Sequence, residues 1–169
     1  LLFRLVLSRF DPETAHHLAF VVIRVLGWPG LRSLTRALTR PDTSLAVRTL
    51  GLEFPSPFGI AAGFDKEALG IAGLGALGFG HVEVGTITGQ PQDGNPKPRL
   101  FRLIPDRAVV NRMGFNNAGA EVCAPRIARA RRARIRPVIG VNIGKTKVVP
   151  VEDAVADYLA STRLLAPHA

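Results

Sequence analysis

A chain of 169 residues with 47% hydrophobic and 21% charged residues has enough apolar side chains to bury one core, which disfavours disorder and makes one domain the default. Its length is too short for a complete eight-stranded β/α barrel, which takes roughly 250 residues. The formal charge of +9 favours an anionic partner, such as a nucleic acid, a phosphate-bearing cofactor or an acidic membrane surface.

The first forty residues are predicted to form three helices. An apolar face recurs at helical spacing before residue 11. Its members are Leu2, Phe3, Val6, Leu7 and Phe10. Asp11 and Pro12 form the start signal of a second helix that runs to about Leu26, and residues 27–30 interrupt it before a third helix.

This helical segment has two interpretations. Its longest unbroken apolar run is the six residues from Leu18 to Ile23, far short of the roughly 20 that span a bilayer. Short apolar helices with basic flanks and Trp28 suit an anchor lying on an anionic membrane surface. The alternative is an ordinary helical hairpin that covers a neighbouring core, and composition alone does not separate the two.

After Pro41 the chain alternates between strands and helices. The predicted strands are Leu45 to Phe54, Phe58 to Gly63, His81 to Thr86 and Pro137 to Gly144. The predicted helices are Lys66 to Leu77, an arginine-rich segment ending before Pro137, and Val151 to Leu165. Near-continuous apolar strands that alternate with helices predict an α/β fold with a parallel sheet covered by helices.

Polar residues follow three of these strands at their carboxyl ends, where ligands gather in parallel α/β folds. The small residues 61–63 leave room for a flat ring against the backbone, and Lys66 adds a cation beside them. Thr86 supplies a hydroxyl and Asn142 an amide, which suit the edge of a heterocycle. We therefore expect a ligand site at these strand ends.

About fifty residues separate the predicted strand that ends at Thr86 from the one that begins at Pro137, which is more than one connecting helix needs. Residues 99–104 and 108–110 are predicted to form a hairpin that leads into residues 111–117. Such a connection is a natural lid or substrate platform. Asn111 and Asn116 either pair with a ligand that has both N–H and C=O groups or cap the loop.

The cysteine and histidine content argues against a disulfide or a metal site. Cys123 is the single cysteine, which fits a reducing cytosolic compartment. His16 and His17 are adjacent, whereas His81 and His168 stand alone, so structural histidines are favoured over metal ligands.

An arginine cluster lies in the helix before Pro137. Its members are Arg126, Arg129, Arg131, Arg132, Arg134 and Arg136. A solvated helix face is favoured over a nucleic-acid patch, because no aromatic residues interleave with these arginines to stack on bases. We therefore expect no nucleic-acid partner.

Five segments together resemble the quinone-dependent (class 2) dihydroorotate dehydrogenases. They are residues 59–66 (GIAAGFDK), 78–86 (GFGHVEVGT), 94–102 (GNPKPRLFR), 111–117 (NRMGFNN) and 140–145 (GVNIGK), in the order and spacing of that family. Residues 11–16 (DPETAH) resemble the family's membrane-associated N-terminal extension, which favours the membrane interpretation of the first helices.

The resemblance implies an FMN enzyme on a (β/α)8 barrel that oxidises dihydroorotate to orotate and passes the electrons to a membrane quinone, in pyrimidine (UMP) biosynthesis. Residues 1–40 would be the membrane-associated, quinone-access extension, and residues 41–169 about the first three β/α units. The protein would lie peripherally on the cytoplasmic face of the cell membrane, with an anionic membrane surface as a partner.

The resemblance also implies roles for individual residues. The FMN-binding positions would be Ala62, Gly63, Phe64, Asp65, Lys66, Thr86 and Asn142. The substrate-binding positions would be Lys66, Asn111, Arg112, Met113, Gly114 and Phe115. The quinone passage would include His16 and Arg102.

The family's serine base has no match here, and Ser161 is not assigned that role. The chain starts at Leu1 without a methionine and stops at Ala169, about where the resemblance places the fourth barrel strand, so we expect it to be the N-terminal part of a longer enzyme. These 169 residues alone would hold FMN weakly and be inactive. Two rival interpretations are a basic nucleic-acid-binding module and a non-catalytic membrane-surface module. The first would show salt-sensitive DNA binding, and the second would lack a site at the strand ends.

Overall fold

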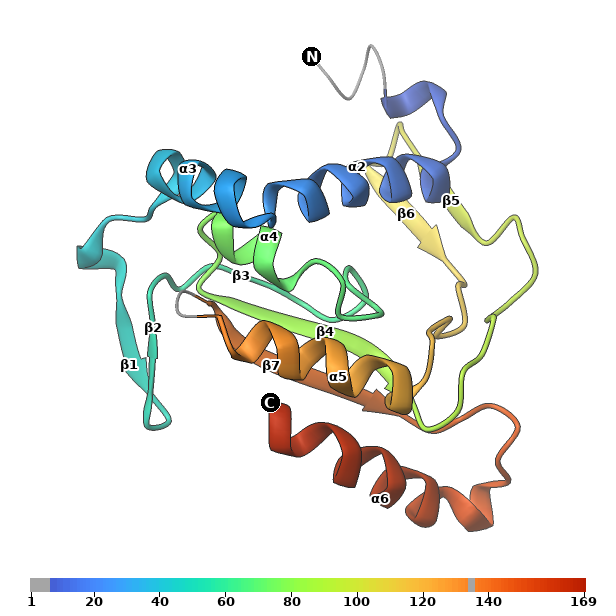
Figure 1. Cartoon of the computed structure of the whole chain (residues 1–169). Helices are drawn as coiled ribbons and strands as arrows, with labels where there is room; N and C mark the ends of the chain where they lie inside the picture. Colours follow the sequence, from blue (N-terminus) through green and yellow to red (C-terminus); the bar gives the residue numbers. More distant parts are fainter. Residues whose placement is uncertain (1–6, 134–135) are drawn as a thin grey trace.

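The computed structural model describes residues 7–133 and 136–169 of the chain (Figure 1). Most of the apolar face predicted before residue 11 lies outside these residues, as does Arg134 of the arginine cluster. The described part begins with a short 3-10 helix, η1 (Leu7–Arg9).

The two helices predicted next are confirmed as α2 (Pro12–Leu26) and α3 (Pro29–Thr39). Asp11 caps α2, because its Oδ1 accepts hydrogen bonds of 3.0 Å from the backbone N–H groups of Glu13 and Thr14. Within the described residues no single helix is long and apolar enough to cross a membrane. The pair α2 and α3 passes that test jointly, but with a bend of 98° between them.

The segment predicted as one strand from Leu45 to Phe54 is instead a short 3-10 helix and a hairpin, which corrects the prediction. After η2 (Thr43–Leu45), β1 (Val47–Thr49) pairs antiparallel with β2 (Leu52–Phe54). The turn residues Leu50 and Gly51 both have positive φ values, which reverses the chain between the two short strands. This hairpin forms its own two-stranded sheet, separate from the central one.

The central sheet is parallel, as predicted. It contains β3 (Gly59–Ile60), β4 (His81–Thr88) and β7 (Val138–Gly144) in the order β3-β4-β7. The register between β4 and β7 shifts between Val84 and Ile87. Gly85 lies in this shift with φ of 108°, and a Cβ there would collide with the Asn142 carbonyl oxygen, so glycine is required.

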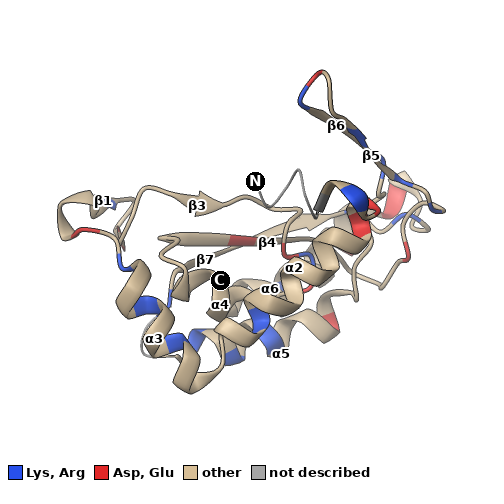
Figure 2. Ribbon diagram, turned by 90° about the horizontal axis from the view of Figure 1, so that it is seen from above, with Lys and Arg blue, Asp and Glu red and all other residues tan. Residues whose placement is uncertain are grey.

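Helices cover one side of this sheet (Figure 2). They are α4 (Ile71–Ala76), α5 (Ala120–Arg131) and α6 (Ala154–Leu165), the last flanked by the 3-10 helices η3 (Val151–Asp153) and η4 (Ala166–His168). The core lies between the sheet and the helices, around fully buried Val82, Val84 and Ile87 of β4. The predicted helix from Lys66 to Leu77 is thus shorter than expected, because residues 66–70 form turns.

A second hairpin, β5 (Leu100–Leu103) and β6 (Ala108–Asn111), is confirmed where the sequence predicted one. It lies beside the first turns of α2, on the side of the molecule toward which β4 and β7 point (Figure 1). The long connection between β4 and β7 therefore brings residues 90–117 to the carboxyl end of the sheet.

Candidate functional site

A hydrogen-bonded network joins the three parallel strands at their carboxyl ends. The Glu83 carboxylate on β4 accepts from the backbone N–H of Ala62 (3.3 Å) and from Nδ2 of Asn142 (3.3 Å). The hydroxyl of Thr86 donates to Oδ1 of the same Asn142 at 2.7 Å. The structure thus brings together Ala62, Thr86 and Asn142, which the sequence placed at one site.

Backbone hydrogen bonds join the segment after β3 to β4. The N–H of Gly63 donates to the carbonyl of Gly85 (2.6 Å), and the N–H of Gly85 donates to the carbonyl of Asp65 (2.9 Å). Gly63 has φ of 101°, and a Cβ built on it would meet nothing within 4 Å. The backbone at Gly63 is therefore open to a flat ligand.

The side chain of Asp65 is used inside its own loop. Its two carboxylate oxygens accept from the N–H groups of Leu69 (2.9 Å) and Gly70 (2.8 Å). Burial raises the pKa of this carboxyl, although the backbone donors oppose that shift. Asp65 thus fixes the conformation of this loop. Because its carboxylate binds the backbone of Leu69 and Gly70, residues 66–70 form turns and α4 begins only at Ile71.

Lys66 lies half-buried in the loop that Asp65 holds. Within the described residues its ammonium group has no hydrogen bond or ion pair. Burial lowers the pKa of Lys66, and repulsion from Arg99 adds to that effect, while attraction to Glu13 opposes it. A weakly compensated cation of this kind is suited to an anionic ligand.

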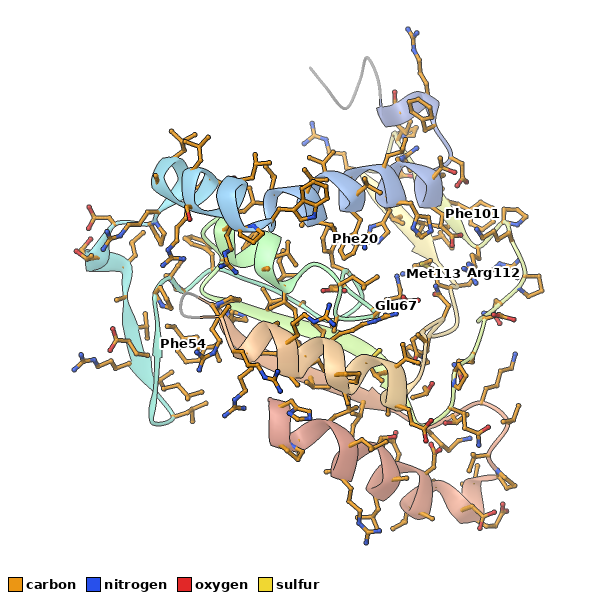
Figure 3. All side chains as sticks on the ribbon, in the orientation of Figure 1. Phe20, Phe54, Glu67, Phe101, Arg112 and Met113 are labelled. Atoms are coloured by element: carbon orange, nitrogen blue, oxygen red, sulfur yellow. The ribbon has the colours of Figure 1, made fainter. Side chains whose placement is uncertain are left out.

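An aromatic cluster connects α2 to the loop after β3. The His16 ring stacks on Phe20 with centroids 5.7 Å apart and meets Phe64 edge-on at 5.1 Å. Burial lowers the pKa of His16, and the positive charge of Lys66 lowers it further. These residues line a cavity of about 190 Å³ that also reaches Met113, here called the His16 cavity. In Figure 3, Phe20, Glu67 and Met113 gather between α2 and the central sheet.

Arg102, predicted to share a passage with His16, lies outside the lining of the His16 cavity. It is on β5, where its Nη1 donates to the carbonyl of Phe10 at 2.7 Å. Arg102 therefore lies against the chain just before α2, while His16 faces the loop of Lys66.

The stretch Asn111–Phe115 approaches Lys66 through Met113, which is buried in the His16 cavity lining. Asn111 Oδ1 accepts from the N–H of Met113 (2.9 Å), which is the loop-capping role. Arg112 is exposed, with Nη2 donating to the Pro98 carbonyl at 3.0 Å.

The other residues of this stretch are held by their backbones. The side-chain amide of Gln92 donates to the carbonyls of Gly114 (3.1 Å) and Phe115 (3.2 Å). Asn116, which also lines the His16 cavity, has a buried Oδ1 without a hydrogen-bond partner in the described structure. Of the two asparagines weighed from the sequence, Asn116 is thus the one with an acceptor still free.

A buried ion pair, which the sequence did not reveal, ties α2 to the loop before β5. Glu13 accepts from Nη2 (2.7 Å) and Nε (3.1 Å) of Arg99, 86 positions away in the chain. Lys97 lies 3.4 Å from the same carboxylate. The hydrogen bonds from Arg99 lower the pKa of Glu13 to about 2.

Glu83 is the second residue that the sequence did not single out. The alternation of side chains along β4 offered a signal, because Val82 and Val84 face the core and Glu83 faces the opposite side. Glu13 offered none, since an acidic residue in the first turn of a helix is ordinarily solvent-exposed.

Comparison with known proteins shows the family of the chain. The family model described as dihydroorotate dehydrogenase matches residues 44–169. The chain belongs to the dihydroorotate dehydrogenase family. Proteins named dihydroorotate dehydrogenase (quinone) from Leifsonia xyli subsp. xyli and Clavibacter sepedonicus are 70% and 69% identical to it over 99% and 100% of this chain.

The chain spans about half the length of these dihydroorotate dehydrogenases, 49% of each. A crystal structure of ligand-free DHODH from Eimeria tenella matches with a TM-score of 0.78 and 43% identity, covering 91% of this chain and 42% of that one. The structure of that enzyme in complex with ferulenol matches with a TM-score of 0.75. The α/β fold of this chain is thus shared with dihydroorotate dehydrogenases of known structure.

Proposed function

We propose that the chain is the N-terminal part of an FMN-dependent enzyme that oxidises dihydroorotate to orotate and reduces a membrane quinone in pyrimidine (UMP) synthesis. The observation that carries this proposal is the network of Glu83, Thr86 and Asn142 beside the Lys66 loop, at the carboxyl end of a parallel sheet. Ligand sites of parallel α/β folds lie at that end. In the whole protein, β3, β4 and β7 would be the first strands of a (β/α)8 barrel.

The residues at the strand ends fit a flat flavin ring. We assign FMN binding to Ala62–Lys66, Thr86 and Asn142, since open backbone lies beside a hydroxyl and an amide. FMN, when bound, supplies the hydride acceptor for dihydroorotate. The chain's own part is to orient the ring: Glu83 holds the Ala62 backbone and the Asn142 amide in a fixed relation.

Dihydroorotate carries a carboxylate, for which Lys66 provides the positive charge. The ammonium group is half-buried, so its attraction to an anion is less screened than at an open surface. The stretch Asn111–Phe115 completes the substrate site, because Met113 lines the same cavity as Lys66. Amide groups in this stretch match the N–H and C=O edges of the substrate.

The quinone passage is assigned to the His16 cavity and to Arg102. Phe20, Phe64 and neutral His16 offer apolar faces to a quinone ring. Val21 and Val22 on α2 are exposed, which supports contact between that helix and lipid. Residues 1–40 then serve as the membrane-associated extension of a peripheral protein on the cytoplasmic face, and residues 41–169 as the start of the barrel.

Because the chain spans about half of its relatives, we attribute the activity to a whole protein that contains these residues. The 169 residues alone would retain FMN weakly and would not oxidise dihydroorotate, since none of their side chains is assigned as the base. Flavin retention together with quinone reduction by the isolated chain would contradict this part of the proposal.

Lys66→Met in the full-length enzyme tests the assignment of the substrate site. Removing the cation is expected to lower kcat/KM for dihydroorotate by about two orders of magnitude, because a preorganised charge is lost at the anionic substrate. Steady-state kinetics with a short-chain quinone measures the effect. Lys147→Met is the matched control, since Lys147 is exposed and its described hydrogen bond uses only the backbone. Equal kinetics for the two variants would remove Lys66 from the site.

A further inference from the structure

A cavity lined by arginines lies between the bend of α2 and α3, the helix α4 and the second half of α5. It has a volume of about 450 Å³ and is here called the arginine cavity. Its arginines are Arg24, Arg32, Arg126 and Arg129. No acidic residue is among the described residues that line it.

The positive charge of the arginine cavity is compensated only in part. Arg126 pairs with Glu67, with Nη1 3.1 Å from the carboxylate and 3.0 Å from the backbone carbonyl. Within residues 7–133 and 136–169, Arg24, Arg32 and Arg129 make no ion pair. A guanidinium presents several N–H donors in one plane, which matches the oxygens of a phosphate group.

The arginines of α5 do not form the single exposed stripe that a nucleic-acid surface would need. Arg126 and Arg129 line the arginine cavity, whereas Arg131 donates to the carbonyl of Ala169 on another side of the helix. Figure 2 shows basic segments on both α3 and α5 in the layer of helices. The cavity thus draws its charge from segments far apart in sequence.

Exposed apolar side chains lie on and beside α3, the helix that carries Arg32. Trp28 lines the arginine cavity and is 62% exposed. On α3, Leu34 and Leu38 are 60% and 79% exposed, which a helix facing water alone does not favour. Tryptophan beside arginine is typical of the headgroup level of a membrane, where one end of each side chain meets lipid and the other meets polar groups.

We propose that the arginine cavity binds the phosphate of an anionic phospholipid, with the acyl chains lying along the exposed leucines of α3. This inference rests on the proposed membrane association and adds a defined lipid site to it. Three uncompensated arginines supply the charge, and Trp28 marks the boundary between headgroup and chains. The protein would therefore prefer anionic lipid over neutral lipid through a specific site rather than through net charge alone.

The full-length protein is tested with vesicles of phosphatidylcholine, with and without phosphatidylglycerol. The variant Arg32→Gln/Arg129→Gln removes two charges from the arginine cavity without touching the His16 cavity. Arg40→Gln/Arg132→Gln removes two exposed charges at the C-caps of the same two helices, α3 and α5, outside the arginine cavity. We expect the cavity variant to lose at least about tenfold more of the preference for phosphatidylglycerol vesicles than the control, since charge-assisted hydrogen bonds are lost with the charge.

Each other outcome has a distinct meaning. Equal losses in the two variants would overturn the lipid site and leave only general surface charge, with the proposed membrane association intact. Full competition by inorganic phosphate at low concentration, or loss of DNA-oligonucleotide binding instead of vesicle binding, would overturn the lipid as ligand. Failure of the unmodified protein to bind either vesicle would overturn the proposed membrane association as well. Thermal melting of both variants checks that they remain folded.

Discussion

At the scale of single residues, the pair Glu13 and Arg99 decides how the N-terminal helices meet the rest of the chain. Both side chains are buried, and Nη1 of Arg99 also donates to the carbonyls of Asp93 (2.6 Å) and Asn95 (3.0 Å). One guanidinium therefore binds a carboxylate on α2 and the backbone of the loop before β5. The negative charge of Glu13 also acts on Lys66 and His16, where it opposes the lowering of their pKa values by burial.

Glu13→Gln is expected to destabilise the full-length protein by about 3 kcal/mol, because removing one partner of a buried ion pair leaves the other charge uncompensated. Urea unfolding measures the change. Glu53→Gln is the matched control: Glu53 pairs with Arg48 at 3.1 Å, but both side chains are largely exposed, so the loss should stay below about 1 kcal/mol. Equal losses of stability in the two variants would show that burial does not increase the contribution of the Glu13–Arg99 ion pair.

The same pair predicts a dependence on pH. The pKa of Glu13 falls from 4.5 to about 2 in the folded chain, so the stability that it adds is complete above pH 4.5 and is lost as the pH falls toward 2. In the Glu13→Gln variant, the free energy of unfolding should therefore decrease less as the pH is lowered from 4.5 toward 2. An unchanged decrease would mean that the carboxylate is not held by Arg99 in solution.

At the scale of elements, close backbone contact lets α2 pack on α4. A Cβ on Gly73 would collide with the carbonyl oxygen of Ile23, and one on Gly27 would lie 2.8 Å from the backbone nitrogen of Gly73. The bend between α2 and α3 lies at this contact. Because α2 also carries His16 and Phe20, the glycines indirectly position the His16 cavity.

Gly73→Ala is expected to separate α2 from α4 and to cost about 2 kcal/mol, within the range for overpacking a filled contact. It should also raise the KM for quinone, because the walls of the His16 cavity move apart. Gly30→Ala is the matched control on α3, where an added Cβ meets nothing within 4 Å, and it should be neutral or slightly stabilising. Unfolding curves and quinone kinetics of both variants test this, and a fully stable Gly73→Ala would refute the close contact.

Element prediction from sequence succeeded where the pattern is local. The ends of α2 and the hairpin of β5 and β6 follow from capping residues and turn residues. The errors come from local turns and loop hydrogen bonds that the apolar pattern does not reveal. The turn at Leu50 divides one predicted strand into β1 and β2, and the bonds of Asp65 to Leu69 and Gly70 prevent an early start of α4.

At the scale of the whole molecule, the helices α2 and α3 have two different faces. One face packs on α4 and β5, and the other exposes apolar side chains, including Trp28 and Leu38. The segment is thus bound to the body of the protein while it presents an exposed apolar surface, which we propose faces lipid. Deleting residues 1–40 would remove both roles at once and would leave Arg99 without its carboxylate.

The double variant Trp28→Ser/Leu38→Ser separates these roles. We expect it to lose most vesicle association at unchanged thermal stability, because both side chains are exposed and contribute little to the folded core. Flotation of the full-length protein with phosphatidylcholine vesicles measures the association. Unchanged flotation would argue that this surface does not face lipid.

The sequence by itself determined the parallel α/β alternation, the family, and the placing of Ala62, Thr86 and Asn142 at strand ends, because these depend on short-range patterns and motifs. Only the tertiary structure decided that Glu83 links these residues, that Glu13 binds Arg99 across 86 positions, and that arginines of α2, α3 and α5 share one cavity. These contacts join segments that are far apart in the chain, so the periodic patterns that indicate helices and strands do not indicate them. They form only when packing of the apolar faces brings the segments together.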